Sequence, residues 1–125
     1  MAQNKLRILI LDDEPIVCQR LRSTLEKIDL DIETFTDPNA SIQRIAEKSF
    51  QVLITDPKMR ELDGIEILKW VQKVSPGTKV IIITGFATVE KAKEALKIGA
   101  YDFIAKPFKL SLIRDLVVRA LGPSH

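Results

Sequence analysis

The sequence predicts a single α/β domain in which helices cover both faces of a five-stranded parallel sheet. Short apolar runs alternate regularly along the chain with segments whose apolar residues recur every three or four positions. Such alternation favours parallel strands joined by right-handed crossovers and buried on both faces. A length of 125 residues suits one domain, which we expect to span residues 1–121 and to end in a polar tail at 122–125.

The predicted strands are runs of apolar, mostly β-branched residues at 7–11, 32–35, 52–55, 80–83 and 101–105. The predicted helices lie between and after them, at 15–28, 40–48, 65–74, 88–98 and 112–120. Pro15 suits the first turn of a helix, residues 75–77 break the third helix, and Gly99 is a good stop for the fourth. The arrangement we expect is the flavodoxin-like strand order 2-1-3-4-5.

The apolar spacing also predicts which side of each helix faces the sheet. The residues expected to face inward are, helix by helix, Val17, Leu21, Leu25 and Ile28; Ile42, Ile45 and Ala46; Ile65, Leu68, Val71 and Val74; Ala92, Ala95 and Leu96; and Leu112, Ile113, Leu116, Val117 and Ala120.

Composition narrows the class of protein. The net charge is +2, and the basic residues are scattered without a Lys/Arg-rich run, which argues against direct nucleic-acid binding. Apolar stretches are far shorter than a membrane span, and the polar N-terminus does not resemble a secretory signal. The single cysteine, Cys18, allows no internal disulfide and has no metal-binding partner motif, so we interpret it as a packing or surface residue. We expect a cytoplasmic protein.

Four of the apolar runs end on polar residues. Asp12 and Asp13 follow the first run, Asp56 the third, Thr84 the fourth and Lys106 the fifth. Each has an ordinary explanation when taken alone: the acids and Thr84 as helix caps or loop residues, and Lys106 as a solvated strand end. Parallel strands, however, bring their carboxyl ends to one edge of a sheet, where open α/β folds place their sites. The set therefore predicts one functional site.

The chemical groups of these five strand-end residues indicate phosphoryl transfer. Three carboxylates in one cleft repel one another, and a divalent cation relieves the conflict. Oxygen-only ligands suit Mg²⁺ better than Zn²⁺. Lys106 adds a second positive charge, Thr84 offers a hydrogen bond, and Gly85 lets a backbone N–H approach a phosphate oxygen. A carboxylate is then available as the nucleophile.

The motifs that carry these residues resemble those of bacterial two-component response-regulator receiver domains. They are Leu11-Asp12-Asp13-Glu14, Thr55-Asp56-Pro57-Lys58-Met59 with Asp63-Gly64, Ile83-Thr84-Gly85 and Lys106-Pro107-Phe108, and the likeness covers residues 5–121. Residues 83–89 and 99–103 are similar to receivers that precede sigma-54-type ATPase activators.

The resemblance implies a role for each site residue. Asp56 would accept a phosphoryl group from a sensor histidine kinase or a phosphotransfer protein. Asp13, Asp56 and the main-chain carbonyl of Lys58 would bind Mg²⁺, and Asp12 would act through a bound water. Lys106 would pair with Asp56 at rest, and the Lys106–Pro107 peptide would be cis.

The resemblance also implies a switch. Thr84 would move to bind the phosphoryl group, and Phe103 would rotate into the space that opens. The alternative is that Phe103 is an ordinary core residue. Because its side chain has no hydroxyl, no hydrogen bond can hold it in the inward position. The output surface, and a possible homodimer interface, would be formed by residues 88–98, 101–105 and the last helix. The chain would catalyse only its own phosphorylation and dephosphorylation.

The chain departs from the family pattern beside the acceptor. Receivers often have proline four residues after it, where this chain has Arg60, whereas Pro57 directly follows Asp56 and removes an N–H donor. We also expect bulky Phe86 to hinder an attacking water. A phosphorylation-independent docking module is therefore an open alternative. An aspartate-nucleophile phosphatase is less favoured because Lys58 stands where its second acid belongs, and a flavodoxin because residues 12–14 would repel a phosphate.

Overall fold

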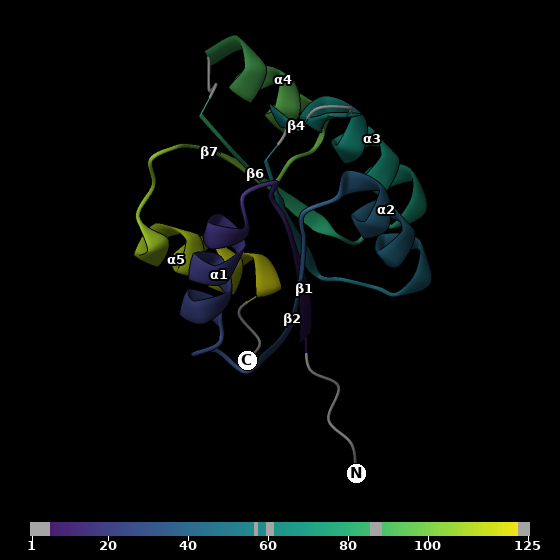
Figure 1. Ribbon diagram of the computed structural model, residues 1–125. Coiled ribbons are helices and arrows are strands. Elements are labelled where there is room, and N and C mark those ends of the chain that lie inside the picture. Colours follow the sequence, from purple (N-terminus) through teal and green to yellow (C-terminus); the bar gives the residue numbers. More distant parts are fainter. Residues whose placement is uncertain (1–5, 57, 60–61, 86–88, 123–125) are drawn as a thin grey trace.

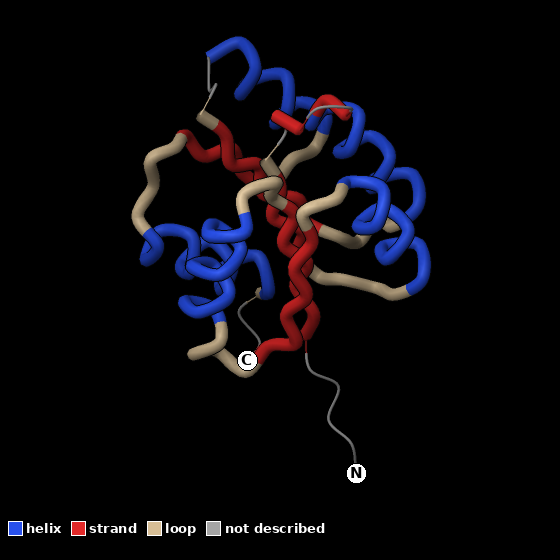
Figure 2. Tube along the Cα trace, viewed as in Figure 1, coloured by secondary structure: helices blue, strands red, loops and turns tan. Residues whose placement is uncertain are grey.

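The computed structural model describes residues 6–56, 58–59, 62–85 and 89–122. Its centre is a parallel sheet, drawn in red in Figure 2. The strand order is β2-β1-β3-β6-β7. Counted among these five strands, the order is 2-1-3-4-5, so the predicted fold is confirmed. The strands are β1 (Leu6–Leu11), β2 (Leu30–Phe35), β3 (Val52–Thr55), β6 (Lys79–Thr84) and β7 (Asp102–Ala105).

Helices cover both faces of the sheet. In Figure 1, α1 and α5 lie on one face, and α2, α3 and α4 lie on the other. Their bounds are α1 (Pro15–Leu25), α2 (Pro38–Glu47), α3 (Gly64–Val74), α4 (Val89–Ile98) and α5 (Leu110–Leu121). None of the described helices is both long and apolar enough to cross a membrane.

One small element was not predicted. The segment after Asp56 contains β4 (Lys58–Met59) and β5 (Leu62–Asp63), which pair antiparallel, where the sequence suggested a loop. Strands of two residues are too short to show an alternating pattern. α3 begins at Gly64, one residue before the start expected at 65.

The sheet separates two apolar cores, because successive side chains of a strand point to opposite faces. The core under α1 and α5 takes Ile8 and Ile10 from β1, while the core under α2, α3 and α4 takes Leu9 and Leu11. All four side chains are almost fully buried, and each contributes about 1.5–3 kcal/mol. Burial on both faces explains why the strands appear in the sequence as uninterrupted apolar runs.

The helix faces were predicted less accurately than the strands. Leu96, Leu112 and Val74 are 47%, 43% and 43% exposed, and Ala46 is exposed as well. These predictions were wrong because each residue lies at the border of its helix's apolar stripe. Other predicted inward positions on the same helices are buried as expected, among them Ile45, Val71, Ala95 and Ile113.

A hydrogen bond joins the C-terminal end of α4 to α3. The Gln72 side-chain amide donates to the Ile98 carbonyl over 2.8 Å. Gly99 follows with a φ of +129°, a conformation that favours glycine, and the Gln72 amide lies where a Cβ on Gly99 would be. The predicted helix stop is therefore confirmed, with a side chain from α3 completing it.

Candidate functional site

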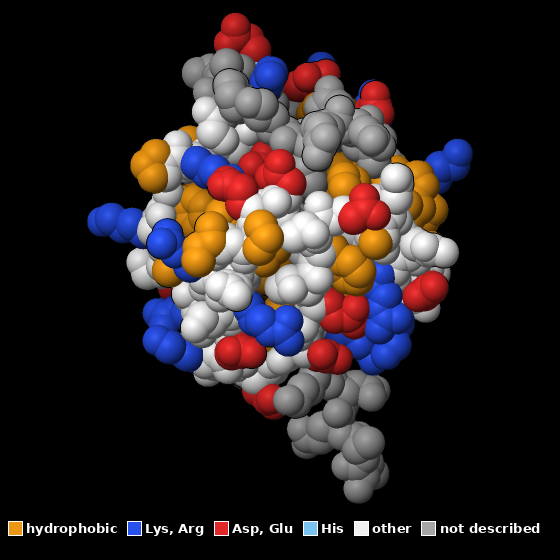
Figure 3. Space-filling model, viewed as in Figure 1, with side chains coloured by type: hydrophobic (Ala, Val, Ile, Leu, Met, Phe, Trp, Pro, Cys, Tyr) orange, Lys and Arg blue, Asp and Glu red, His pale blue; other side chains and the backbone are white. Residues whose placement is uncertain are grey.

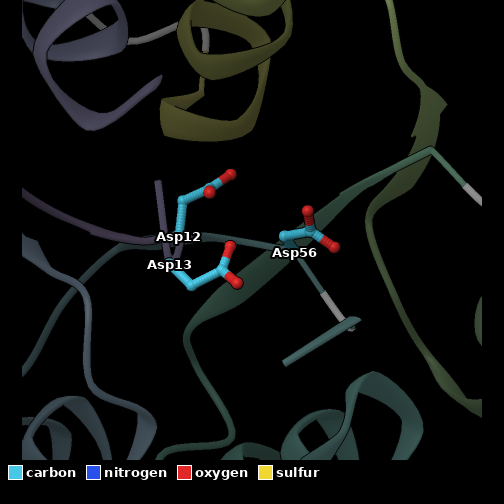
Figure 4. A group of neighbouring side chains, drawn as sticks. All are labelled: Asp12, Asp13 and Asp56. Carbon is cyan, nitrogen blue, oxygen red and sulfur yellow. The ribbon is translucent and has the colours of Figure 1, made fainter. Parts of the chain in front are cut away.

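The polar residues that end the strands meet at the carboxyl edge of the sheet. Asp12 and Asp13 follow β1, and Asp56 follows β3, the neighbouring strand. Each offers a carboxylate oxygen within 4.8 Å of the others, and Figure 4 shows the three groups around a common space. Acidic side chains gather on the surface above this edge (Figure 3). The structure thus assembles the acidic cluster that the spacing predicted.

Asp12 is buried and is held by two donors. It is 3% exposed, its Oδ1 accepts from the Glu14 backbone N–H at 2.9 Å, and its Oδ2 lies 3.2 Å from Lys106 Nζ. Burial raises the pKa of Asp12 above its usual value, and these two donors only partly oppose the effect. Both oxygens of Asp12 are thus engaged by donors of the protein.

Lys106 provides the positive charge of the site. Its Nζ donates to Asp56 Oδ2 over 2.8 Å, and Glu14 Oε1 is 4.0 Å away. Burial by itself lowers the pKa of Lys106, but the hydrogen bond to Asp56 and the charges of Asp12 and Asp56 outweigh it and raise the pKa. The ammonium therefore stays charged. The Lys106–Pro107 peptide is cis, as the resemblance implied.

Asp56 is held at the end of the β-ladder. Its backbone N–H donates to the Leu11 carbonyl over 3.2 Å, and the residue is 7% exposed. Asp13, by contrast, is exposed. The three carboxylates form an oxygen-only donor set that fits a hard cation such as Mg²⁺. Lys58 lies two residues after Asp56, in β4.

The predicted switch residues lie on neighbouring strands. Thr84 ends β6 and is 2% exposed, and the next residue, Gly85, has open space where a Cβ would stand. Phe103, in β7, is half-buried and packs against the core under α2, α3 and α4. Pro57, Arg60 and Phe86, on which three predictions rest, lie outside the described residues.

Two residues beside the site were not singled out as functional. Cys18 is buried behind Asp12 and donates from Sγ to the carbonyls of Asp12 and Phe35 over 3.6 and 3.7 Å. Thr55 is fully buried, and its Oγ1 has no hydrogen-bond partner in the part of the chain that the structure describes. Nothing in a sequence distinguishes a strand threonine with a partner from one without.

A groove lies next to Lys106. Its volume is about 590 Å³, and its lining residues come from the start of α1 and from the segment between β7 and α5: Glu14, Val17, Arg20, Lys106, Pro107, Phe108 and Leu110. A surface hollow therefore borders the acceptor region directly.

Comparison with known proteins identifies the family. The profile of the family described as "Response regulator receiver domain" matches residues 8–118. The chain belongs to this family. The sequence resemblance is thereby confirmed, including its likeness to receivers of sigma-54-type activators. The chain is a receiver domain of the kind found in two-component response regulators, a signalling module.

Receiver relatives are much longer than this chain. Identity is 32% to the response regulator protein PilR of Pseudomonas aeruginosa, 94% of this chain matching 26% of the relative. It is 36% to the regulatory protein AtoC of Escherichia coli, 92% of this chain matching 25% of the relative. The chain thus spans about a quarter of these relatives.

Solved receiver structures match nearly the whole fold. The beryllofluoride-activated NtrC4 receiver domain dimer has a TM-score of 0.86 at 32% identity, covering 91% of this chain and 94% of that one. A receiver domain protein from Clostridium thermocellum has a TM-score of 0.85 at 30% identity, covering 93% and 94%.

Proposed function

We propose that Asp56 is the phosphoryl acceptor of this receiver domain. One Asp56 oxygen attacks the phosphorus of a phosphohistidine on the partner, the P–N bond breaks, and the imidazole leaves with the electron pair of that bond. The observation that carries the proposal is the placement of the Asp56 carboxylate. It lies 2.8 Å from the Lys106 ammonium and inside the cluster with Asp12 and Asp13.

The other residues stabilise the charge that the phosphoryl group brings. A Mg²⁺ ion held by Asp13, Asp56 and the Lys58 carbonyl, with Asp12 acting through water, would neutralise phosphoryl oxygens. Lys106 moves its hydrogen bond from the Asp56 carboxylate to a phosphoryl oxygen. Thr84 donates its hydroxyl proton to another, and the Gly85 backbone approaches through the open space beside it.

Phosphorylation then changes the surface formed by α4, β7 and α5. Movement of Thr84 toward Asp56 opens space that the half-buried Phe103 fills from β7. We propose this surface as the output face and as the interface of a homodimer, supported by the solved dimer of the activated NtrC4 receiver. For Phe86 the expectation from the sequence is that its bulk hinders an attacking water, so Phe86→Ala should speed dephosphorylation.

The groove beside Lys106 is the proposed docking place for the kinase or phosphotransfer protein in the cytoplasm. Its lining includes Lys106, which contacts the Asp56 carboxylate, and Ile16, on α1 nearby in sequence, is 53% exposed. Val17→Asp would place a charge in the groove without touching the acidic cluster. It should slow phosphorylation by a phosphohistidine protein while leaving phosphorylation by acetyl phosphate unchanged.

The acceptor is tested by incubating the domain of residues 1–121 with acetyl phosphate, with and without Mg²⁺. Intact mass should show one added phosphoryl group in the wild type and none in Asp56→Asn. Asp31→Asn, which changes an acid near the opposite end of β2, is the matched control and should be phosphorylated normally. An unmodified wild type would instead favour the phosphorylation-independent docking module.

A further inference from the structure

The hydroxyl of Thr55 is the one buried side-chain group near the acceptor without a hydrogen-bond partner in the described part of the chain. The residue is fully buried at the end of β3, directly before Asp56. A buried hydroxyl without a partner costs free energy, because it has lost its bonds to water and gained none in exchange. An arrangement that provides a partner would be favoured over this one.

The strand register places Thr55 on the same face as the proposed switch residues. Thr55 pairs with Ile82, and Ile82 pairs with Phe103, so the three form one row across β3, β6 and β7. Leu53, Ile82 and Phe103 belong to the core under α2, α3 and α4. Because side chains alternate, Thr55 and Thr84 point to that same face.

Thr84 is the diagonal neighbour of Thr55 across this strand pair. It lies two residues after Ile82, the direct partner of Thr55, and with strands about 4.8 Å apart and a rise of about 3.3 Å per residue the two Cα atoms are about 8 Å apart. The movement proposed for Thr84 is toward the phosphoryl group on Asp56, and therefore toward β3. That movement brings the two hydroxyls closer together.

We propose that Thr55 is a positioning residue of the switch, whose hydroxyl donates to the Thr84 hydroxyl once Thr84 has donated to the phosphoryl group. A hydroxyl has one proton to give and lone pairs to accept, so Thr84 can serve both bonds at once. Thr55 supplies the hydrogen bond that Phe103, without a hydroxyl, does not offer. This inference rests on the proposed function of Asp56.

The test measures beryllofluoride binding, as a stand-in for the phosphoryl group, in the presence of Mg²⁺. Thr55→Val keeps the shape of the side chain and removes the hydroxyl. It should raise the Tm of the free protein and weaken beryllofluoride binding by about fivefold to tenfold, the loss of one hydrogen bond. Thr55→Ser should bind like the wild type.

A second buried threonine provides the control. Thr78 donates to the Phe50 carbonyl over 2.6 Å, near the amino end of β6. Thr78→Val should lower the Tm and leave beryllofluoride binding unchanged. A Thr55→Val protein that binds beryllofluoride as tightly as the wild type would overturn the inference, as would one with a lowered Tm in the free state. Failure of the Thr55 inference differs from failure of the proposed function of Asp56. In the second case the wild type itself would not bind beryllofluoride.

Discussion

The ammonium of Lys106 donates to Asp56 Oδ2 over 2.8 Å and so connects the end of β7 to the end of β3, across the intervening strand β6. The same nitrogen lies 3.2 Å from Asp12 Oδ2. One cation thus balances two buried carboxylates from different strands, and removing it leaves like charges facing each other.

Lys106→Met should therefore destabilise the metal-free domain. With the ammonium gone, Asp12 and Asp56 repel each other in a largely buried site, and we expect a loss of about 1–3 kcal/mol. Added Mg²⁺ should restore most of that loss. Urea unfolding with and without Mg²⁺ measures both effects. Lys109→Met, at an exposed position three residues further on, is the control. If Lys106→Met and the wild type were equally stable without Mg²⁺, Lys106 would not be needed to offset the repulsion between Asp12 and Asp56.

Asp12→Asn should stabilise the metal-free domain at neutral pH, in contrast to Lys106→Met. Burial raises the pKa of Asp12, so its charged form costs stability at any pH above that raised value. As the pH falls through the folded-state pKa toward 3.8, wild-type Asp12 gains its proton in the fold first, and wild-type stability approaches that of the variant.

Thermal unfolding between neutral and mildly acidic pH tests this dependence. Asn still offers an oxygen to the Glu14 N–H, so the local bond survives. Asp13→Asn, at an exposed carboxylate, should change metal-free stability little. An Asp12→Asn protein that is less stable than the wild type at neutral pH would show that the carboxylate is needed for the fold.

The ion pair between Glu33 and Arg44 predicts a different pH dependence. Arg44 Nε and Nη2 donate to the two Glu33 oxygens over 2.7 and 2.8 Å, which holds the pKa of Glu33 below 4.5. Its stabilising effect is present above 4.5 and is lost as the pH falls through the lowered pKa. Because the pair is partly solvated, Glu33→Gln should lower the Tm at neutral pH by only about 2–3 °C.

The Glu33→Gln effect should disappear in acid, where the wild-type carboxylate is protonated too. Glu47→Gln removes a more exposed partner of the same arginine and serves as the comparison. A Tm difference that persists unchanged at low pH would point to packing rather than charge.

Gly99→Ala should destabilise the junction of α3 and α4 by about 1–3 kcal/mol. The positive φ disfavours any Cβ there, and the Cβ would meet the Gln72 side chain. In the double variant with Gln72→Ala the clash is gone and the backbone strain remains. The two changes should therefore cost less together than the sum of their single effects. Gly77→Ala, where a Cβ meets open space, should be nearly neutral in urea unfolding.

The sequence predicted the parts of this protein in which one physical requirement dominates. Runs such as 80–83 are apolar because both faces of the sheet are covered, and the residues after them reach a common edge because parallel strands share a direction. Leu96 and Leu112 were misplaced because apolar spacing gives the direction of a helix stripe and not its width.

Other features depend on three-dimensional relations that no local pattern records. The partnerless hydroxyl of Thr55 and the contact of Gln72 with the end of α4 require the positions of neighbouring elements. The hairpin of β4 and β5 is too short to leave a periodic signal. The predictions about Pro57, Arg60 and Phe86 stay predictions.

The sheet divides the apolar interior into two cores, and this division separates the proposed switch residues from the groove. Thr84 and Phe103 face the core under α2, α3 and α4, whereas α1 and the groove beside Lys106 rest on the other core. Side chains on one face of the sheet can repack without disturbing those on the opposite face. The sheet thus separates the repacking proposed for Thr84 and Phe103 from the core that supports the groove. Because α5 lies on the groove's side of the sheet, the part of the proposed output face next to this repacking is the part formed by α4 and β7.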